Sequence, residues 1–134
     1  MMQITIKTCN RNDMVDITQD IVKKIHAAGL KDGFCFIFVP HTTAAVTINE
    51  NADPSVKTDL EMILNKIIPW EDGYRHLEGN AAAHMKSVLV GASEIIAVEN
   101  GQPVLGTWQS VFFCEFDGPR TRKVILKFMP SVSC

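Results

Sequence analysis

The chain has 134 residues, of which 13 are lysine or arginine and 15 are aspartate or glutamate, so its formal net charge at pH 7 is -2. This length predicts a single domain over residues 1–134, with one ordinary core and no room for a large enclosed cleft, so we expect any site to be shallow or shared between subunits. The nearly neutral charge argues against a nucleic-acid-binding protein, and no apolar run reaches the ~18–20 residues that a membrane span needs.

The N-terminal region predicts a strand followed by an amphipathic helix. Residues 2–8 alternate apolar and polar side chains, as a half-buried strand does. They lack the basic and apolar segments of a secretory signal, which predicts a cytoplasmic protein. In the helix that follows, Asp16 and Gln19 resemble a capping box and Gly29 supplies a left-handed stop. Its apolar stripe consists of Ile17, Ile21, Ile25 and Ala28.

The next segment predicts two strands and a second helix. Residues 33–39 are continuously apolar, which is typical of a strand covered on both faces. Residues 44–48 form a further short strand. The pair Asp53-Pro54 places an N-cap and a first-turn proline at the start of a helix that ends before Pro69. The predicted buried stripe of this helix is Val56, Leu60, Ile63, Leu64 and Ile67.

A polar loop at residues 69–80 precedes a third helix and a run of strands. Asn80 is the predicted cap of this helix, and Gly91 is its stop. Its inner stripe is Ala81, His84, Met85 and Val88. The strands that follow cover residues 94–98, 104–105, 108–116 and 121–128, and the last two are predicted to form a hairpin around residues 117–119. The fold class is therefore α+β, a single compact domain with a mixed or antiparallel sheet and about three helices.

Three histidines lie at the ends of predicted elements, so they could converge on a metal ion. His41 follows an apolar strand, His76 lies in the polar loop and His84 lies on the third helix. In one continuous helix His76 and His84 would be about 12 Å apart, too far to share an ion, but Gly79 and Asn80 allow the chain to fold back. Three imidazoles with an open fourth position are typical of catalytic zinc. The alternative is a core histidine at position 84 and surface histidines at 41 and 76.

Glu115 is the second candidate for chemistry. Within the strand at residues 108–116 it shares a face with Val111 and Phe113, so its carboxylate is either at a wet rim or buried with a partner. Partial burial raises the pKa of a carboxyl and suits a general acid or base. The alternative is an ion pair with Arg120 or Arg122, two residues that could otherwise clamp a phosphate.

The cysteines predict neither a disulfide framework nor a cysteine zinc site. They form no C-x-x-C pair, and two of them lie inside apolar runs, where a free thiol behaves as a small hydrophobe. The four positions are Cys9, Cys35, Cys114 and Cys134.

Several motif blocks together resemble the YjbQ family of small cytoplasmic proteins. The first is His41-Thr-Thr-Ala-Ala-Val-Thr-Ile-Asn-Glu50, followed by Asp53-Pro54-Ser-Val-Lys-Thr-Asp-Leu60. The later blocks are His76-x-x-Gly79-Asn80-x-x-x-His84, then Gly106-x-Trp108-Gln109, then Glu115-Phe-Asp117-Gly118-Pro119-Arg120. The blocks occur in the family's order and span nearly the whole chain.

The resemblance implies a homotrimer of α+β subunits with the polar motif residues near the subunit contacts. It also implies a functional label, secondary thiamine-phosphate synthase, in a family that is otherwise uncharacterised. In that reaction a pyrimidine diphosphate transfers its carbon to the nitrogen of a thiazole phosphate and releases pyrophosphate. The implied metal or ligand cluster is His41, His76 and His84. The implied substrate-binding residues are Glu50, Asn80, Trp108, Gln109, Asp117 and Arg120.

In this hypothesis Glu115 and Arg120 are the catalytic residues. Arg120 and a divalent cation assist the pyrophosphate leaving group, Trp108 stacks on a heterocycle, and Glu115 orients water or Arg120. Imidazole ligands favour zinc, whereas pyrophosphate chemistry favours magnesium. Three alternatives stay open: a trimer that binds a metal or small ligand without turnover, a metal-assisted hydrolase of small phosphorylated molecules, and a purely structural trimer.

Overall fold

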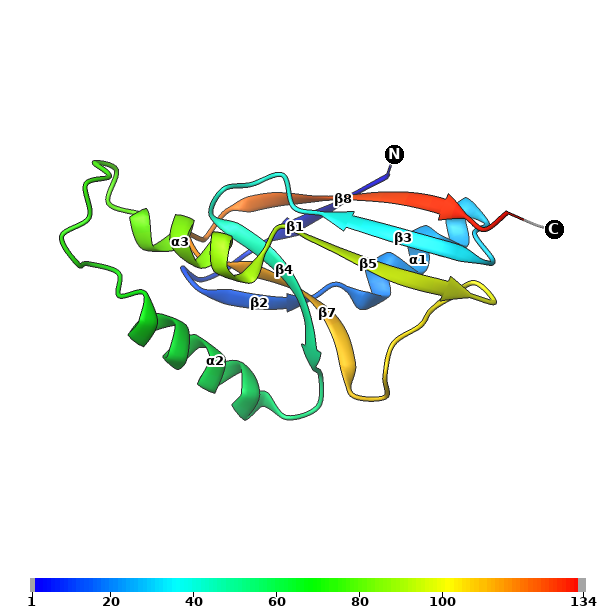
Figure 1. Ribbon diagram of the computed structural model, residues 1–134, viewed down its shortest axis with the longest axis horizontal. Helices are drawn as coiled ribbons and strands as arrows, with labels where there is room; N and C mark the ends of the chain where they lie inside the picture. Colours follow the sequence, from blue (N-terminus) through cyan, green and yellow to red (C-terminus); the bar gives the residue numbers. More distant parts are fainter. Residues whose placement is uncertain (1, 133–134) are drawn as a thin grey trace.

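The computed structural model describes residues 2–132 and has an α+β fold built on two antiparallel sheets (Figure 1). The larger sheet has the spatial order β1 (Met2–Lys7), β8 (Thr121–Pro130), β3 (Gly33–Phe38), β5 (Ser93–Glu99) and β6 (Gln102–Pro103). The smaller sheet has the order β2 (Asp13–Asp16), β7 (Gln109–Glu115) and β4 (Ala44–Glu50). The predicted fold class is confirmed, and β2 is a strand that the sequence patterns did not indicate.

The described residues form three helices, α1 (Thr18–Ala28), α2 (Pro54–Ile67) and α3 (Ala81–Val90). The predicted start of α2 is confirmed, because the Asp53 carboxylate accepts a hydrogen bond from the Ser55 N–H at 2.9 Å. The predicted capping box of α1 is wrong: Ile17 holds the N-cap position, and Asp16 instead accepts from the Thr18 N–H at 2.9 Å. None of the helices within residues 2–132 is long and apolar enough to cross a membrane.

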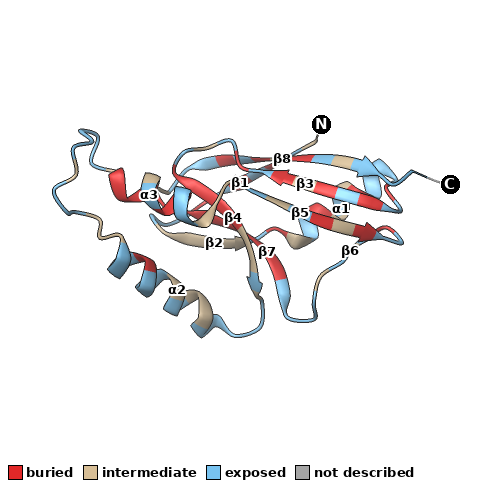
Figure 2. Ribbon diagram, in the orientation of Figure 1, coloured by how far each residue is buried: buried red, intermediate tan, exposed pale blue. Residues whose placement is uncertain are grey.

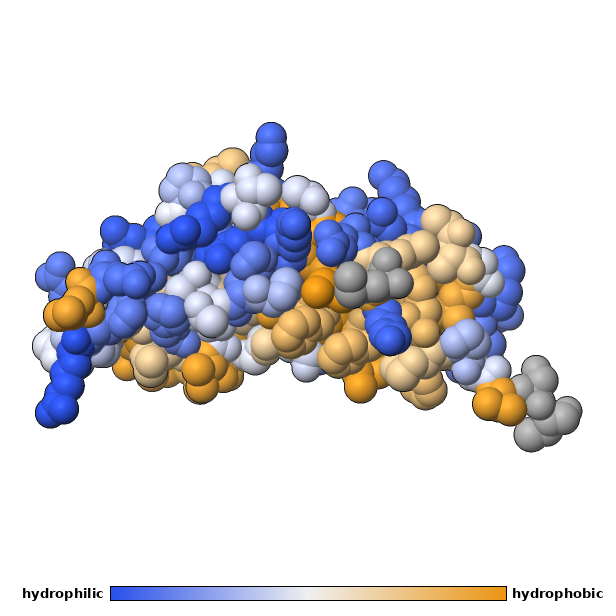
Figure 3. All heavy atoms as spheres, turned by 90° about the horizontal axis from the view of Figure 1, so that it is seen from above, coloured by the Kyte–Doolittle hydropathy of each residue, from blue (hydrophilic) through white to orange (hydrophobic). Residues whose placement is uncertain are grey.

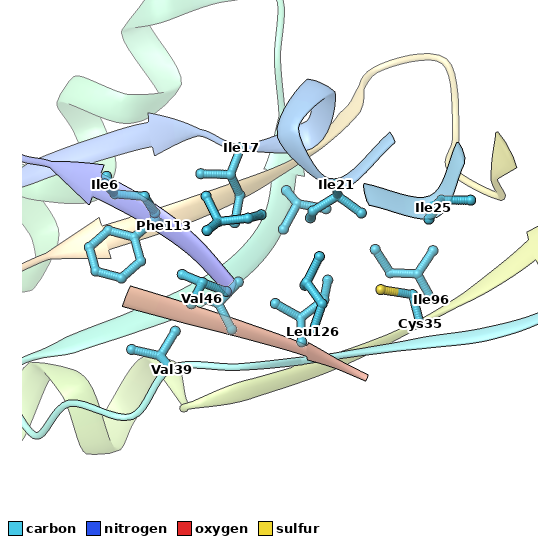
Figure 4. Close-up of a cluster of buried hydrophobic side chains, with 14 of the residues drawn as sticks. Ile6, Ile17, Ile21, Ile25, Cys35, Val39, Val46, Ile96, Phe113 and Leu126 are labelled. Atoms are coloured by element: carbon cyan, nitrogen blue, oxygen red, sulfur yellow. The ribbon is translucent and has the colours of Figure 1, made fainter. Parts of the chain in front are cut away.

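The main core lies between the two sheets and is closed by α1. Figure 4 shows Ile17, Ile21 and Ile25 pointing from the α1 region toward side chains of the strands, and all three are fully buried. Their apolar spacing is the signal that predicted this helix, although Ala28, which the same pattern included, is exposed. Strand residues that complete this core include Ile6, Cys35, Val46, Phe113 and Leu126.

A second, smaller core lies on the opposite face of the smaller sheet, under α2 and α3. It consists of Ala45, Leu64, Ala83, Cys114 and Phe116. The predicted inner stripe of α3 is wrong in part, because Met85 and Val88 are 47% and 79% exposed while Lys86 is buried. On α2 only Leu64 of the predicted stripe is buried. Both helices therefore keep apolar side chains on their outer surfaces.

The larger sheet is covered on one face only. Burial alternates along β3, so that Cys35 and Ile37 are buried while Phe34 and Phe38 are 47% and 37% exposed (Figure 2). The prediction that this strand is covered on both faces is wrong for the single chain. Its continuous apolar pattern reflects an outward face rich in aromatic residues.

The predicted hairpin of the last two long strands is also wrong. Strand β7 pairs with β2 and β4, whereas β8 pairs with β1 and β3, so the chain changes sheets between them. Gly118 is needed at this crossing because a Cβ atom there would clash with the backbone oxygen of Asn10. The turn residues were recognisable in the sequence, but the identity of the partner strands depends on long-range packing.

The cysteines of the described residues form no disulfide. Cys9, Cys35 and Cys114 are free thiols, and the last two are buried. Burial raises the pKa of the Cys35 thiol to about 12, which keeps it neutral. Cys134 lies outside the described residues.

Candidate functional site

An open cavity of about 570 Å³ lies where the end of β3 and the start of β4 meet the N-terminus of α3. The crossing from β7 to β8 forms another wall. Six of the polar residues that line it are His41, Asn80, His84, Asp117, Arg120 and Arg122. Five of these are predicted site residues, so the fold gathers one part of the predicted site here.

The floor of this cavity rests on a buried ion pair between Glu115 and Arg122. Glu115 is fully buried and Arg122 is 5% exposed. The Arg122 guanidinium donates from Nε to Glu115 Oε1 at 2.8 Å and from Nη2 to Oε2, which is a two-pronged contact. The ion pair that the sequence analysis kept as the alternative for Glu115 is therefore confirmed, with Arg122 and not Arg120 as its partner.

Two threonines and two backbone groups complete the polar shell of this ion pair. Thr8 donates its hydroxyl to Glu115 Oε1 at 2.8 Å, and Thr43 accepts from Arg122 Nη2 at 2.8 Å. The N–H groups of Phe116 and Asp117 both donate to Glu115 Oε2 at 3.1 Å. Neither threonine was a predicted site residue: Thr8 belongs to no motif block, and Thr43 lies in the block that begins at His41 but nothing local to it indicates a contact with Arg122.

The hydrogen bonds decide the ionisation of Glu115. Burial alone raises the pKa of a carboxyl, but the bonds from Arg122 and Thr8 and the nearby guanidinium charge favour the carboxylate. The net result is a pKa below the ordinary 4.5. This direction is opposite to that of a carboxyl tuned upward for acid–base work.

Asp117 organises the rim of the cavity. Its Oδ2 accepts from Arg120 Nη2 at 3.0 Å and from Asn80 Nδ2 at 2.9 Å. The Arg120 side chain is 53% exposed, so its remaining donors face solvent. Asn80 holds the N-cap position of α3, as predicted, but its side chain makes no capping hydrogen bond. Its Oδ1 is buried and has no hydrogen-bond partner within residues 2–132. The rim therefore offers two groups to a ligand. One is the guanidinium of Arg120, which Asp117 holds in place, and the other is Asn80 Oδ1, which accepts no hydrogen bond within residues 2–132.

His41 is held in one tautomer. Its Nε2 accepts a hydrogen bond from the Lys123 N–H at 2.9 Å, so a neutral ring carries its proton on Nδ1. Burial, followed by the charge of Arg122, lowers the pKa of His41 below the ordinary 6.5. His41 is thus a neutral donor through Nδ1, with Nε2 already occupied.

The three predicted metal ligands do not come together. His76 and His84 stack edge to face with ring centroids 5.0 Å apart, as the folding back of the chain at Gly79 predicts. The Nε2 atom of His41 already accepts a hydrogen bond from the Lys123 N–H, and His76 is not among the residues that line the cavity. Across residues 2–132 no group of three or more His, Cys, Asp or Glu side chains could hold a metal ion. These residues do not fit a metal centre within one chain.

The remaining predicted site residues lie at the far end of the smaller sheet. Glu50 pairs with Gln109 across β4 and β7, whereas Glu115 pairs with Ala44 at the other end. Six residues of extended chain separate the two ends by about 20 Å. Trp108, which is 63% exposed, lies beside Gln109 at the far end. Within one chain, the predicted substrate-binding residues therefore form two groups at opposite ends of the smaller sheet.

Comparison with known proteins connects the chain to one family. The family model described as UPF0047 protein YjbQ-like matches residues 2–131. The UPF0047 protein YugU of Bacillus subtilis is 52% identical over 127 residues, which cover 94% of this chain and 96% of that protein. The UPF0047 protein MJ1081 of Methanocaldococcus jannaschii is 51% identical over 129 residues, with 96% and 94% coverage.

The fold has solved counterparts as well. A crystal structure of an uncharacterized conserved protein of the YjbQ/UPF0047 family from Clostridium acetobutylicum matches with a TM-score of 0.94 and 46% identity. The match covers 96% of this chain and all of that one. None of these names states an activity.

Substituting Glu115→Gln should destabilise the fold by about 3–5 kcal/mol, because it leaves the buried Arg122 charge without its carboxylate. Equilibrium urea unfolding measures the change. Asp117→Asn is the matched control: it weakens an ion pair whose arginine is half-exposed, and we expect about 1 kcal/mol or less. Equal losses in the two variants would show that the buried pair has no special role.

The same ion pair predicts an acid dependence. Because the folded pKa of Glu115 lies below 4.5, its contribution to stability is complete above that pH and is lost as the pH falls through the folded pKa. The free energy of unfolding of the wild type should therefore decrease below about pH 4.5 more steeply than that of Glu115→Gln. Parallel pH profiles would contradict the assigned direction of the shift.

We expect His41 to titrate below pH 6.5 and to occupy the Nδ1–H tautomer. Nitrogen-15 NMR of the imidazoles measures both properties, and a His41→Gln variant assigns the signal. His26, whose ring lies 2.9 Å from the Gln102 amide, provides a second surface imidazole in the same spectrum. An Nε2–H tautomer for His41 would show that the bond from Lys123 does not form.

Proposed function

This chain belongs to the YjbQ-like UPF0047 family, and from that premise we propose that its open cavity binds a small phosphorylated molecule, in keeping with thiamine-phosphate synthase activity. One observation carries the proposal: Arg120 is fixed at the cavity rim by Asp117 while half of its side chain stays exposed. A guanidinium whose orientation is fixed and whose outer donors are free matches a phosphate oxygen pair. Arg122, by contrast, directs its guanidinium to the Glu115 carboxylate.

The other groups in the cavity suit an oxyanion with a polar neighbour. The Nδ1–H of His41 is a neutral donor, and the buried Asn80 Oδ1 accepts from a ligand N–H or O–H. The negative charge of Asp117 offsets that of Arg120, so the cavity has little excess positive charge. It therefore selects a ligand by the position of its polar groups and does not attract every anion. The cavity therefore supports recognition of one phosphate with an attached donor-bearing group.

In the proposed reaction the carbon–oxygen bond between the pyrimidine methylene and its diphosphate breaks, and a carbon–nitrogen bond to the thiazole phosphate forms. Negative charge develops on the departing pyrophosphate, where Arg120 stabilises it. Glu115 accepts bonds from Arg122, Thr8 and two backbone N–H groups, so we assign it a positioning role beneath the rim. The predicted zinc or magnesium ion stays a prediction.

We also propose that the subunits form the homotrimer that the family resemblance implies, through the uncovered face of the larger sheet. Phe34 and Ile95 are 47% and 59% exposed and lie on the outward side of adjacent strands. Figure 3 shows apolar residues gathered along one side of the molecule, at the lower edge of the view. A contiguous apolar face of this kind is typical of a subunit interface.

Assembly would give the second group of predicted residues a role. Trp108, Gln109 and Glu50 lie about 20 Å from Glu115 within one chain. In a closed ring a neighbouring copy can place this group against the open cavity and supply the wall that a small domain lacks. Trp108 would then stack on the heterocycle of the ligand.

Arg120→Ala should weaken binding of the pyrimidine diphosphate and of the thiazole phosphate by at least about tenfold, because one charge-assisted contact is lost. Isothermal titration calorimetry measures the affinity, and pyrophosphate release measures turnover. Lys31→Ala is the control, since it removes a positive charge at the opposite end of β3. Unchanged affinity in Arg120→Ala would exclude Arg120 from the site. A panel of phosphate esters, with release of inorganic phosphate as the readout, tests the hydrolase alternative.

The double variant Phe34→Glu with Ile95→Glu should dissociate the trimer, because charges on the uncovered face are desolvated in an interface. Light scattering coupled to size exclusion gives the mass of each species. Leu77→Glu, at a loop position that is 99% exposed, is the control and should leave the mass unchanged. A monomeric wild type, or an unaltered mass for the double variant, would contradict the proposed interface.

A further inference from the structure

A second cavity, of about 270 Å³, lies between α2 and the face of the smaller sheet that carries Cys114. Among the described residues, none lines both this cavity and the open cavity beside His41. Part of its wall is apolar and consists of Leu60, Leu64, Val90 and Phe116. The rest of the wall is polar or charged, and a small cavity that combines an apolar wall with polar groups can hold a small molecule.

The polar end of this cavity contains a buried ammonium group. Lys86 comes from the inner face of α3 and is 1% exposed. Its Nζ donates to Asn65 Oδ1 on α2, and within residues 2–132 no carboxylate lies within 4.0 Å of it. An ammonium has three donors, and a buried charge without a counter-ion is costly. Glu61 lines the same cavity and its charge acts on Lys86 from a distance, but no carboxylate of the described residues contacts the ammonium group.

A second group in the same cavity also lacks a partner. Asn12 belongs to the segment between β1 and β2, and its Oδ1 is buried without a donor from any residue between 2 and 132. A buried carbonyl oxygen without a hydrogen bond is rare and points to a bound molecule or water. The cavity therefore presents one donor cation and one bare acceptor.

The neighbouring groups do not meet either need. Lys57 uses its own ammonium on the Met14 carbonyl at 3.2 Å and lies over the Phe112 ring. Burial raises the pKa of the Cys114 thiol to about 12, so this sulfur stays neutral. The carboxylates of Asp13, Glu61 and Glu115 also line the cavity, but none of them lies within 4.0 Å of Lys86 Nζ, and Glu115 is already paired with Arg122. What is missing is an anionic oxygen in contact with Lys86 and an N–H or O–H that donates to Asn12.

We propose that this cavity binds a small 2-amino or 2-hydroxy acid with an apolar side chain. The carboxylate of the ligand pairs with Lys86 Nζ, and its amino or hydroxyl group donates to Asn12 Oδ1. The apolar side chain packs against Leu64 and Val90 on the helices that close the cavity. The inference is independent of the proposed phosphate site.

The test uses four probes of one shape: leucine, 2-hydroxy-4-methylpentanoate, 4-methylpentanoate and 4-methylpentan-1-ol. Methyl NMR titrations of the full chain follow the signals of Leu64 and Val90. We expect saturable shifts with leucine or the hydroxy acid, weaker binding of the plain acid and no binding of the alcohol. Comparison of leucine with the hydroxy acid shows whether the donor is an ammonium or a hydroxyl group. Absence of saturation with both would overturn the proposal and leave a cavity that holds water only.

Two variants separate a specific site from general anion binding. Lys86→Met should reduce the affinity for all three acids at least about tenfold, whereas Lys57→Met, at the same cavity, should leave it within a factor of about two. Asn12→Leu should remove the advantage of the 2-substituted acid over the plain acid and leave the plain acid unaffected. Arg120→Ala should not alter any of these affinities. Equal binding to the wild type and Lys86→Met would contradict the assigned contact.

Discussion

The buried ion pair of Glu115 and Arg122 is the constraint on which the rest of the structure depends. Glu115 ends β7 in the smaller sheet, and Arg122 lies near the start of β8 in the larger one. Their contact joins two sheets that share no hydrogen-bonded strands, at the point where the chain crosses between them. A buried charge pair tolerates little displacement, because each partner alone would leave an uncompensated charge.

The open cavity follows from this constraint. The backbone N–H groups of Phe116 and Asp117 donate to the Glu115 carboxylate, and that of Arg120 donates to the Thr8 hydroxyl. These bonds hold the segment from Phe116 to Arg120 in place. Asp117 and Arg120 are therefore presented at a defined position next to His41 and Asn80. A polar rim on a rigid base loses little entropy on binding, which is what a shallow site in a small domain requires.

The sequence predicted the elements better than their partners. Helix spacing located Ile17, Ile21 and Ile25, and the Asp53-Pro54 pair located the start of α2, because both signals are local. The hairpin of the last strands was wrong, since a turn motif says nothing about which strands pair beyond it. The outward face of β3 was misjudged for a related reason: an apolar pattern cannot distinguish a face covered within the chain from one left open on its surface.

For the site, the sequence by itself determined which residue types were available, because the motif blocks name them. Only the tertiary structure decided their use. It paired Glu115 with Arg122, bound His41 to Lys123 and separated Trp108 from Arg120. It also buried Lys86 beside a cavity in which no carboxylate of the described residues contacts its ammonium group. The physical reason is that pairing and burial are properties of groups far apart in the chain, such as Thr8 with Glu115, which no local pattern records.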